Sequence, residues 1–287
     1  MNINTETRVL GLLGNPVEHS LSPFLHNQVF ALLGLNCVYL PFKVETGKLE
    51  DAVRGIRGLN LAGVNVTIPY KEAVIPYLDE LSPEASACGA VNVIKNSAGG
   101  LTGYNTDGIG FLGALRQENI TEHKRVLFIG AGGAARSLAA TLANSGASHL
   151  YFLDPDQRRA AEAAEWLKKQ YVCETVTDLM NEENFRAMAV NADLLINCSP
   201  VGMYPAVDES PVVSLDSVPD TAVLCDIIYN PLRTKLLQMG QERGLKCITG
   251  LSMFAHQAAL TLKILLDADP PLEYMQSELV KRLELES

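Results

Sequence analysis

The segment Gly130–Ala135 constrains the fold of this 287-residue chain more strongly than any other feature. It reads Gly-Ala-Gly-Gly-Ala-Ala, follows the β-type run Arg125–Ile129 and precedes a helical pattern, which is the context that gives G-x-G-x-x-A its meaning. The first glycine permits a tight turn, the second admits a pyrophosphate close to the backbone, and a small third residue lets the helix pack on the strand. The start of the helix supplies free N–H groups. We therefore expect a dinucleotide at Gly130, Ala131, Gly132, Gly133 and Ala134.

Asp154 follows the next predicted strand, Leu150–Leu153, and bears on the kind of dinucleotide. An acid at this place accepts hydrogen bonds from both adenosine ribose hydroxyls and repels a 2′-phosphate, so it favours NAD over NADP. Asp154-Pro155-Asp156 is also a good helix cap with proline at the first helical position, and the two roles can coexist. Arg158 and Arg159 could in principle meet the 2′-phosphate of NADP, but they lie one helical turn further on, so NAD is favoured.

The chain reads as two α/β blocks. In the first, Ser22 is expected to cap a helix with Pro23 as its first residue and Gly34 as its stop. Gly99-Gly100 marks a hairpin turn, so the sheet of this block should be mixed. The strands expected here are 9–13, 38–42, 63–67, 91–94 and 101–104.

In the second block, strands alternate with helical patterns, which predicts a doubly wound parallel sheet of Rossmann type. Its expected strands are 125–129, 149–153, 194–197, 223–227 and 246–248. We expect a substrate-binding domain over 1–108 and a dinucleotide-binding domain over 109–251, with a cleft between them. The C-terminal helices, about 252–287, should pack back on the first domain.

Composition narrows the class of protein further. A net charge of −10 argues against nucleic acid or anionic membrane as a partner, and no apolar stretch approaches the 18 residues that span a bilayer. The six cysteines are scattered without a C-x-x-C pair, and the first residues show no signal region. We expect a cytoplasmic enzyme that binds a small molecule and no metal, as a monomer or a homodimer.

Lys71 is the first candidate for chemistry. The predicted strand Gly63–Thr67 must stop at Pro69, which leaves Lys71 at the carboxyl edge of the sheet, where open α/β sheets bind ligands. Asp107 follows the strand Leu101–Tyr104 and should lie at the same edge. A lysine and an aspartate placed in this way can move a hydroxyl proton, although Lys71 taken alone is better explained as a surface lysine that opens a short helix.

Near the N-terminus, Ser20 and Ser22 stand around a helix start, which is in outline an anion site suited to a carboxylate. Simple capping by Ser22 is the alternative on this segment.

Together these segments resemble the shikimate/quinate dehydrogenase family, in the family's order and over almost the whole chain. The motifs that carry the resemblance are Gly14–Pro23 with His26-Asn27, Asn65–Lys71, Gly89–Asn92, Gly103–Asp107, Gly130–Arg136, Ile196–Met203, Asp226–Pro231 and Gly250–Met253 with Gln257.

The resemblance implies a role for each motif. Lys71 and Asp107 would be the catalytic pair, and Ser20 and Ser22 would hold the substrate carboxylate. Further substrate contacts would come from Thr67, Asn92, Asn105 or Thr106, Tyr229 and Gln257. The nicotinamide would be bordered by Asn197–Ser199, Gly250 and Met253. Asp154 and Arg158, taken from the residues and not from the resemblance, are the further candidates for cofactor binding.

Two departures from the family pattern matter. Gly89-Ala90-Val91-Asn92 is followed by Val93 where the family usually has threonine, so one hydroxyl is absent. Leu153-Asp154-Pro155 stands where biosynthetic members commonly carry Asn-Arg-Thr or Asn-Arg-Ser for the phosphate of NADP. The prediction is therefore an NAD-preferring quinate/shikimate dehydrogenase. The alternatives are an NADPH-dependent shikimate dehydrogenase, a relative that acts on an amino-substituted analogue, and a nucleotide-sensing regulatory protein without activity.

Overall fold

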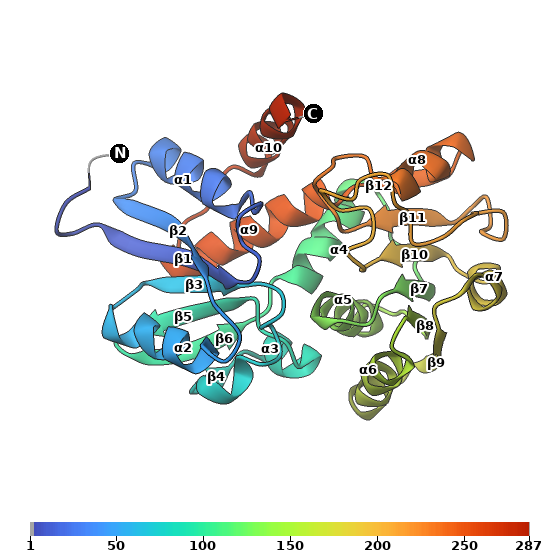
Figure 1. The fold of residues 1–287 in the computed structure, drawn as a ribbon, viewed down its shortest axis with the longest axis horizontal. Coiled ribbons are helices and arrows are strands. Elements are labelled where there is room, and N and C mark those ends of the chain that lie inside the picture. The colour runs from blue at the N-terminus through green and yellow to red at the C-terminus, as the bar shows by residue number, and fades with distance from the viewer. Residues whose placement is uncertain (1–2, 287) are drawn as a thin grey trace. The chain divides into compact units, whose positions relative to one another are not determined.

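The chain folds into two compact α/β units (Figure 1). The structure, a computed structural model, describes residues 3–286. The first unit contains the residues up to Asp107 together with Ala255–Leu279, and the second contains Gly108–Phe254 together with the residues from Val280 on. The hairpin signal in the first block and the alternation of strands and helices in the second predicted one mixed and one parallel sheet, and both sheets are confirmed.

The sheet of the first unit has the order β2-β1-β3-β5-β6-β4. β1, β2 and β3 are parallel, whereas β5 runs antiparallel to both β3 and β6. The strands are β1 (Arg8–Gly14), β2 (Cys37–Lys43), β3 (Gly63–Val66), β4 (Glu80–Leu81), β5 (Val93–Ser97) and β6 (Gly100–Tyr104). Around them lie α1 (Ser22–Leu33), α2 (Leu49–Gly58), η1 (Ile75–Tyr77) and α3 (Pro83–Cys88).

The sheet of the second unit is parallel throughout, in the order β12-β11-β10-β7-β8-β9. With β7 counted as the first strand, the strands lie in the order 6-5-4-1-2-3, which is the order of the Rossmann fold. The direction of winding reverses between β7 and β10. The strands are β7 (Arg125–Ile129), β8 (His149–Asp154), β9 (Glu174–Leu179), β10 (Leu194–Asn197), β11 (Val223–Asp226) and β12 (Lys246–Ile248). The helices of this part of the chain are α4 (Asp107–Gln117), α5 (Gly133–Asn144), α6 (Gln157–Gln170), α7 (Glu182–Ala189) and α8 (Lys235–Glu242). The chain continues into α9 (Gly250–Leu266) and α10 (Leu272–Glu286), most of whose residues belong to the first unit or are divided between the two.

Each unit has its own apolar core, which fixes the strand ends that carry the polar side chains described below. In the second unit β10 is buried at every residue and β7 at every residue after Arg125, and Phe128 stacks on Phe152 with ring centroids 4.9 Å apart. Such near-continuous apolar strands are expected where helices cover both faces of a parallel sheet. In the first unit α9 packs on the sheet, because a Cβ added to Gly63 would come within 2.5 Å of Leu265.

Three local predictions are corrected. The N-cap of α1 is Leu21, without a side-chain cap, and Ser22 is the first helical residue, because the hydroxyl of Ser20 accepts the backbone N–H of Ser22. Ala98 and Gly99 form the hairpin turn with positive φ, and Gly100 already belongs to β6. Asp156 rather than Asp154 caps α6, so Pro155 lies before the cap. Gly34 ends α1 at φ 66°, as predicted.

Candidate functional site

Lys71 and Asp107 form a shielded ion pair in the first unit. The Nζ of Lys71 lies 2.6 Å from Oδ2 of Asp107, and the two side chains are only 16% and 7% exposed. Lys71 follows the turn that ends β3, and its carbonyl accepts the N–H of Val91. Asp107 is the first residue of α4, where the helix dipole favours a negative charge. Because one N–H of the ammonium satisfies Asp107, two further donors remain for a ligand.

Asn92 fixes the other side of the Asp107 carboxylate. Its amide nitrogen donates to Oδ1 of Asp107 at 2.8 Å and to the hydroxyl of Thr106 at 2.9 Å. Its amide oxygen accepts the backbone N–H of Thr106 at 2.8 Å. Asn92 and Thr106, both predicted to contact substrate, are therefore brought together with the pair Lys71–Asp107. Both amide donors of Asn92 are engaged, so it orients Asp107 in addition to any contact with a ligand.

A buried network behind this cluster was not assigned a role from the sequence. Asn65 accepts the hydroxyl of Tyr39 at 2.7 Å and donates to the carbonyl of Asn92 and to Thr261 on α9. The ring of His26 stacks on Tyr39 with centroids 4.4 Å apart and is 1% exposed. Burial lowers the pKa of His26 to about 3, so the ring is neutral. In the sequence, Asn65 is a polar residue within an otherwise apolar strand and opens the family motif Asn65–Lys71, but neither signal gave it a role.

The other predicted substrate residues of the first unit lie at or near strand ends and on α9. Thr67 follows β3, and a Cβ added to Gly14 at the end of β1 would meet its methyl group at 2.3 Å. Ser20 belongs to the segment between β1 and α1, and Ser22, the first residue of α1, is buried. Gln257 is buried on α9, one turn before Thr261.

The glycine loop of the second unit is built to receive a phosphate group. Gly130 has φ 96° and donates its N–H to the carbonyl of Leu153, so it turns the chain sharply after β7. A Cβ at Gly130 would come within 3.1 Å of the Cys198–Ser199 peptide, which shows how closely the loop approaches the end of β10. Gly132 is the N-cap of α5 and, having no side chain, makes no side-chain cap to the N–H groups of the first turn. The residues present thus fit a pyrophosphate at the reversal point of the sheet.

Asp154 faces this loop, but its oxygens are occupied by backbone. It is 5% exposed, Oδ2 accepts the N–H of Ala131 at 2.8 Å, and Oδ1 accepts that of Asp156 at 2.9 Å. Arg158 is directed elsewhere, since its 87% exposed side chain pairs with Asp156 at 3.1 Å. Arg159, considered from the sequence only as an alternative contact for the phosphate of NADP, lies at the glycine loop. A Cβ on Gly132 would come within 3.0 Å of its guanidinium.

Asn197 and Ser199, predicted to border the nicotinamide, form one unit after β10. The side-chain oxygen of Asn197 accepts the N–H of Ser199 at 3.0 Å and its hydroxyl at 2.7 Å. The amide nitrogen of Asn197 donates to Oδ1 of Asp226 at 3.1 Å. The sequence gave Asp226 no role, although an acid that ends a β-type run is the same signal that singled out Asp107 and Asp154.

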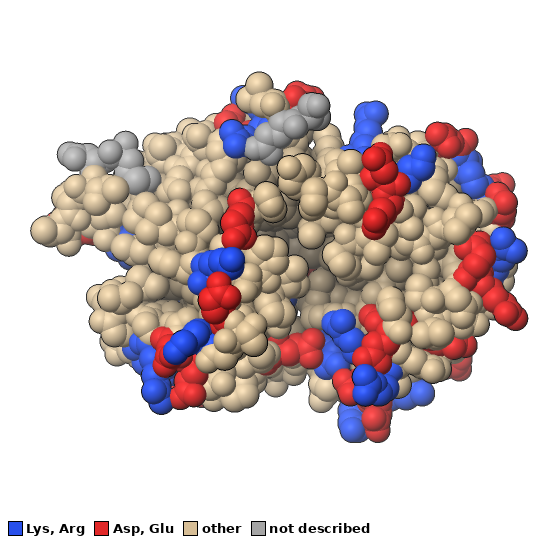
Figure 2. Space-filling model, viewed as in Figure 1, with Lys and Arg blue, Asp and Glu red and all other residues tan. Residues whose placement is uncertain are grey.

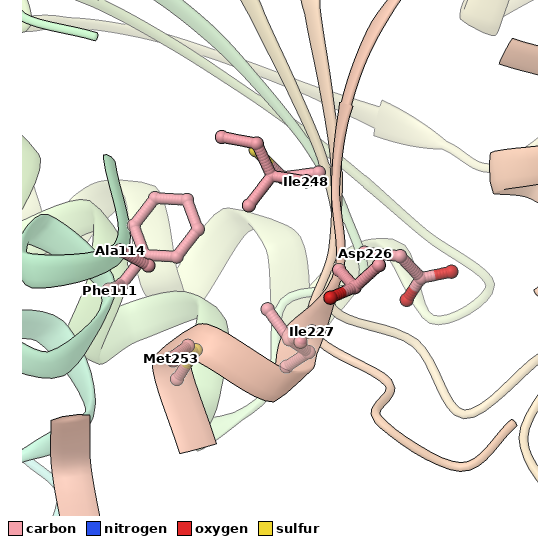
Figure 3. Close-up of a pocket in the computed structure, with 9 residues that line it drawn as sticks. Phe111, Ala114, Asp226, Ile227, Ile248 and Met253 are labelled. Carbon is pink, nitrogen blue, oxygen red and sulfur yellow. The ribbon is translucent and has the colours of Figure 1, made fainter. Parts of the chain in front are cut away.

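A small apolar pocket lies near the end of β11 (Figure 3). Met253 and Gly250 belong to it, and the carboxyl group of Asp226 points away from the ring of Phe111. Tyr229 of the same unit stacks on Phe254 with centroids 4.4 Å apart. Gly250 approaches backbone so closely that a Cβ there would lie 2.3 Å from the carbonyl oxygen of Ile227. The pocket is lined in part by Phe111, Ala114, Asp226, Ile227, Ile248 and Met253.

The described residues also limit the other kinds of site. Within residues 3–286, no group of three or more His, Cys, Asp or Glu side chains is placed to hold a metal ion. No helix in this part of the chain has both the length and the apolar character that a bilayer crossing requires. Among the described residues on the face seen in Figure 2, acidic and basic side chains are interspersed, without a large area of one sign.

Comparison with known proteins identifies relatives along the whole chain. Residues 12–94 match the shikimate dehydrogenase substrate binding domain family, and residues 126–206 match the saccharopine dehydrogenase NADP binding domain family. A shikimate dehydrogenase (NADP(+)) of Syntrophomonas wolfei is 52% identical over 284 residues, which cover 99% of this chain and 98% of that protein.

Solved structures agree with these matches. The Listeria monocytogenes shikimate 5-dehydrogenase in complex with shikimate and NAD has a TM-score of 0.89 at 33% identity, covering 97% of this chain and 98% of its own. The Corynebacterium glutamicum quinate dehydrogenase in complex with NAD has a TM-score of 0.86 at 28% identity, covering 96% and 99%.

Proposed function

Because the chain belongs to the shikimate dehydrogenase family, we propose that it interconverts shikimate and 3-dehydroshikimate and that it prefers NADP(H) as its nicotinamide cofactor. The observation that carries the proposal is the pair Lys71–Asp107, with Nζ and Oδ2 2.6 Å apart in a shielded position. A bound nicotinamide would supply the hydride chemistry. The chain itself would hold the ring, exclude water and move the hydroxyl proton.

The roles of the residues follow from their contacts. Lys71 takes the proton from the reacting ring oxygen in oxidation and returns it in reduction, and Asp107 holds the Lys71 amine in place. Asn92 keeps the carboxylate of Asp107 oriented toward the lysine. Ser20 and Ser22 bind the substrate carboxylate, while Thr67, Thr106, Tyr229 and Gln257 meet the ring hydroxyls or that carboxylate.

The cofactor preference revises the expectation of NAD drawn from the sequence. Each carboxylate oxygen of Asp154 accepts a backbone N–H, so both oxygens already have partners within the protein. Arg159 lies beside Gly132 and offers a guanidinium to a 2′-phosphate, whereas Arg158 is paired with Asp156. The Syntrophomonas relative is named as an NADP(+) enzyme, which supports the same reading.

An NAD-dependent activity on quinate or shikimate is the second candidate. The carboxylate of Asp154 beside the glycine loop favours it, as do the solved relatives in complex with NAD. Measuring kcat/KM for NAD and NADP with quinate and with shikimate separates the candidates. Shikimate with NADP should give the highest value. A higher value for any NAD combination would reject the proposed cofactor, and no turnover in any combination would reject the activity.

Arg159→Ala tests the phosphate contact. We expect kcat/KM for NADP to fall about 10- to 100-fold, since a charge-assisted hydrogen bond contributes about 1.5–3 kcal/mol, while the value for NAD stays close to that of the unmodified protein. Arg158→Ala is the matched control, because it removes the same charge from the neighbouring position. Equal losses in the two variants would contradict a specific role for Arg159.

A further inference from the structure

Asp226 is a buried carboxylate with hydrogen-bond donors on both oxygens. It ends β11 and is 1% exposed. Oδ1 accepts the amide of Asn197 at 3.1 Å and the backbone N–H of Ile228 at 3.0 Å. Oδ2 accepts the hydroxyl of Thr234 at 2.7 Å. These described hydrogen-bond partners are all neutral.

The first set of hydrogen bonds from Asp226 leads, through Asn197, to the segment after β10. Because Asp226 accepts from the amide nitrogen of Asn197, the amide oxygen must face the other way. That oxygen accepts both the N–H and the hydroxyl of Ser199. One oxygen of Asp226 thus fixes the rotation of the Asn197 amide and, through it, the turn at Ser199, whose peptide N lies 3.1 Å from a Cβ added to Gly130.

The second set of hydrogen bonds leads, through Ile228, to the segment after β11. The N–H of Ile228 points at Asp226, which holds the chain between Ile227 and Tyr229. Gly250 donates its N–H to the carbonyl of Ile228, and Gly250 has no room for a Cβ against the carbonyl of Ile227. The start of α9 therefore rests on backbone that Asp226 holds in place.

We propose that Asp226 is a positioning residue. From one buried carboxyl group it sets the loop Asn197–Ser199 and, through Ile228, the backbone on which Gly250 rests, and the family resemblance places Asn197–Ser199 and Gly250 beside the nicotinamide. The inference rests on the proposed function, since that function requires a nicotinamide cofactor. Asp226 does not touch the cofactor and acts through Asn197 and Ile228. Burial raises the pKa of this carboxyl to about 6.

Three variants test the proposal, with the Kd for NADP and NAD as the first readout and kcat with shikimate as the second. Asp226→Ala removes every acceptor, so we expect cofactor Kd to rise about tenfold or more and kcat to fall. Asp226→Asn keeps an acceptor for Asn197 and Ile228 and can turn its NH₂ toward the hydroxyl of Thr234. We expect this variant to restore Kd to within about threefold of the unmodified protein.

Phe185→Leu is the matched control for lost stability. Phe185 is fully buried in the core of the same unit, so the variant should lower Tm without changing cofactor Kd. An equal rise in Kd for Phe185→Leu and Asp226→Ala at matched loss of Tm would overturn the proposal. So would an unchanged Kd in Asp226→Ala, or a failure of Asp226→Asn to restore binding.

The readouts separate this inference from the proposed function. If the unmodified protein binds NADP or NAD but turns over neither shikimate nor quinate, the proposed activity fails, and the Kd comparison still decides the role of Asp226. If it binds neither dinucleotide, both proposals fail.

Discussion

Asp107 of the first unit and Asp226 of the second are buried to a similar degree and have opposite surroundings. Asp107 is 5% exposed and has the ammonium of Lys71 at 2.6 Å, whereas Asp226 is 1% exposed and has only an amide, a hydroxyl and a backbone N–H among its described hydrogen-bond partners. A carboxylate beside a cation can hold and orient a group that exchanges protons. A carboxylate among neutral donors can only collect and orient those donors. On the roles proposed for Asp107 and Asp226, the hydrogen-bond partner and not the depth of burial decides the use of a buried acid.

Lys71→Met should give the largest effect, since it converts the surroundings of Asp107 into those of Asp226. The variant keeps the length of the side chain but has no ammonium, so we expect kcat to fall by about 10²- to 10⁴-fold with a smaller change in KM. Steady-state kinetics with shikimate measure this. Lys71→Arg is the control, because it keeps the ion pair but cannot lose its proton, and it should not restore kcat. Near-normal turnover in either variant would rule out Lys71 as the acid–base residue.

Asp226→Asn should change how the free energy of unfolding depends on pH. Burial raises the pKa of Asp226 to about 6 from 3.8, so between these values the folded protein holds a proton that the unfolded chain has released. The contribution of Asp226 to stability is therefore full below about pH 4 and falls by about 3 kcal/mol as pH rises through 6. Asparagine carries no such proton.

We therefore expect Asp226→Asn to gain stability relative to the unmodified protein as pH rises from 4 to 7. Urea unfolding across this range measures the difference. Asp220→Asn is the control, because the side chain of Asp220 is 86% exposed and its surface pair with Arg243 contributes little. A difference that stays constant with pH would show that Asp226 does not titrate in this window.

Asn92→Ala should give a smaller effect on the other side of the comparison. It removes the hydrogen bond to Oδ1 of Asp107 but leaves the bond from Lys71. A hydrogen bond to a charged group contributes about 1.5–3 kcal/mol, of which we expect part in the transition state, so kcat should fall about tenfold. Unchanged kcat with a raised KM for shikimate would mean that Asn92 serves binding alone.

The sequence predicted what depends on neighbours along the chain. The strand, glycine loop and helix around Gly130 were found because each step has a local physical reason, and Lys71 was placed at a strand end because Pro69 must stop the strand. The start of α1 was missed by one residue, since the choice between Leu21 and Ser22 depends on where the hydroxyl of Ser20 points.

Features that depend on tertiary contacts were beyond the sequence. Nothing local distinguishes Arg159 from Arg158, and only the packing of α6 brings the first of them to Gly132. The role of Asp226 depends on the pairing of β10 with β11, which sets Asn197 opposite Asp226. Asn197 and Asp226 both belong to motifs that carry the resemblance to the family, but the resemblance gave no role to Asp226.

The burial of His26 has a consequence for experiments in which activity is measured as a function of pH. Its ring is enclosed between aromatic neighbours, and burial lowers its pKa to about 3. An imidazole of this kind stays in one protonation state from mildly acidic to alkaline solution. Its ¹⁵N resonances should not move between pH 5 and 9, so any limb of a pH–activity curve in that range must be assigned to another group. The ¹⁵N resonances of His26 thus serve as a constant reference signal while other groups titrate.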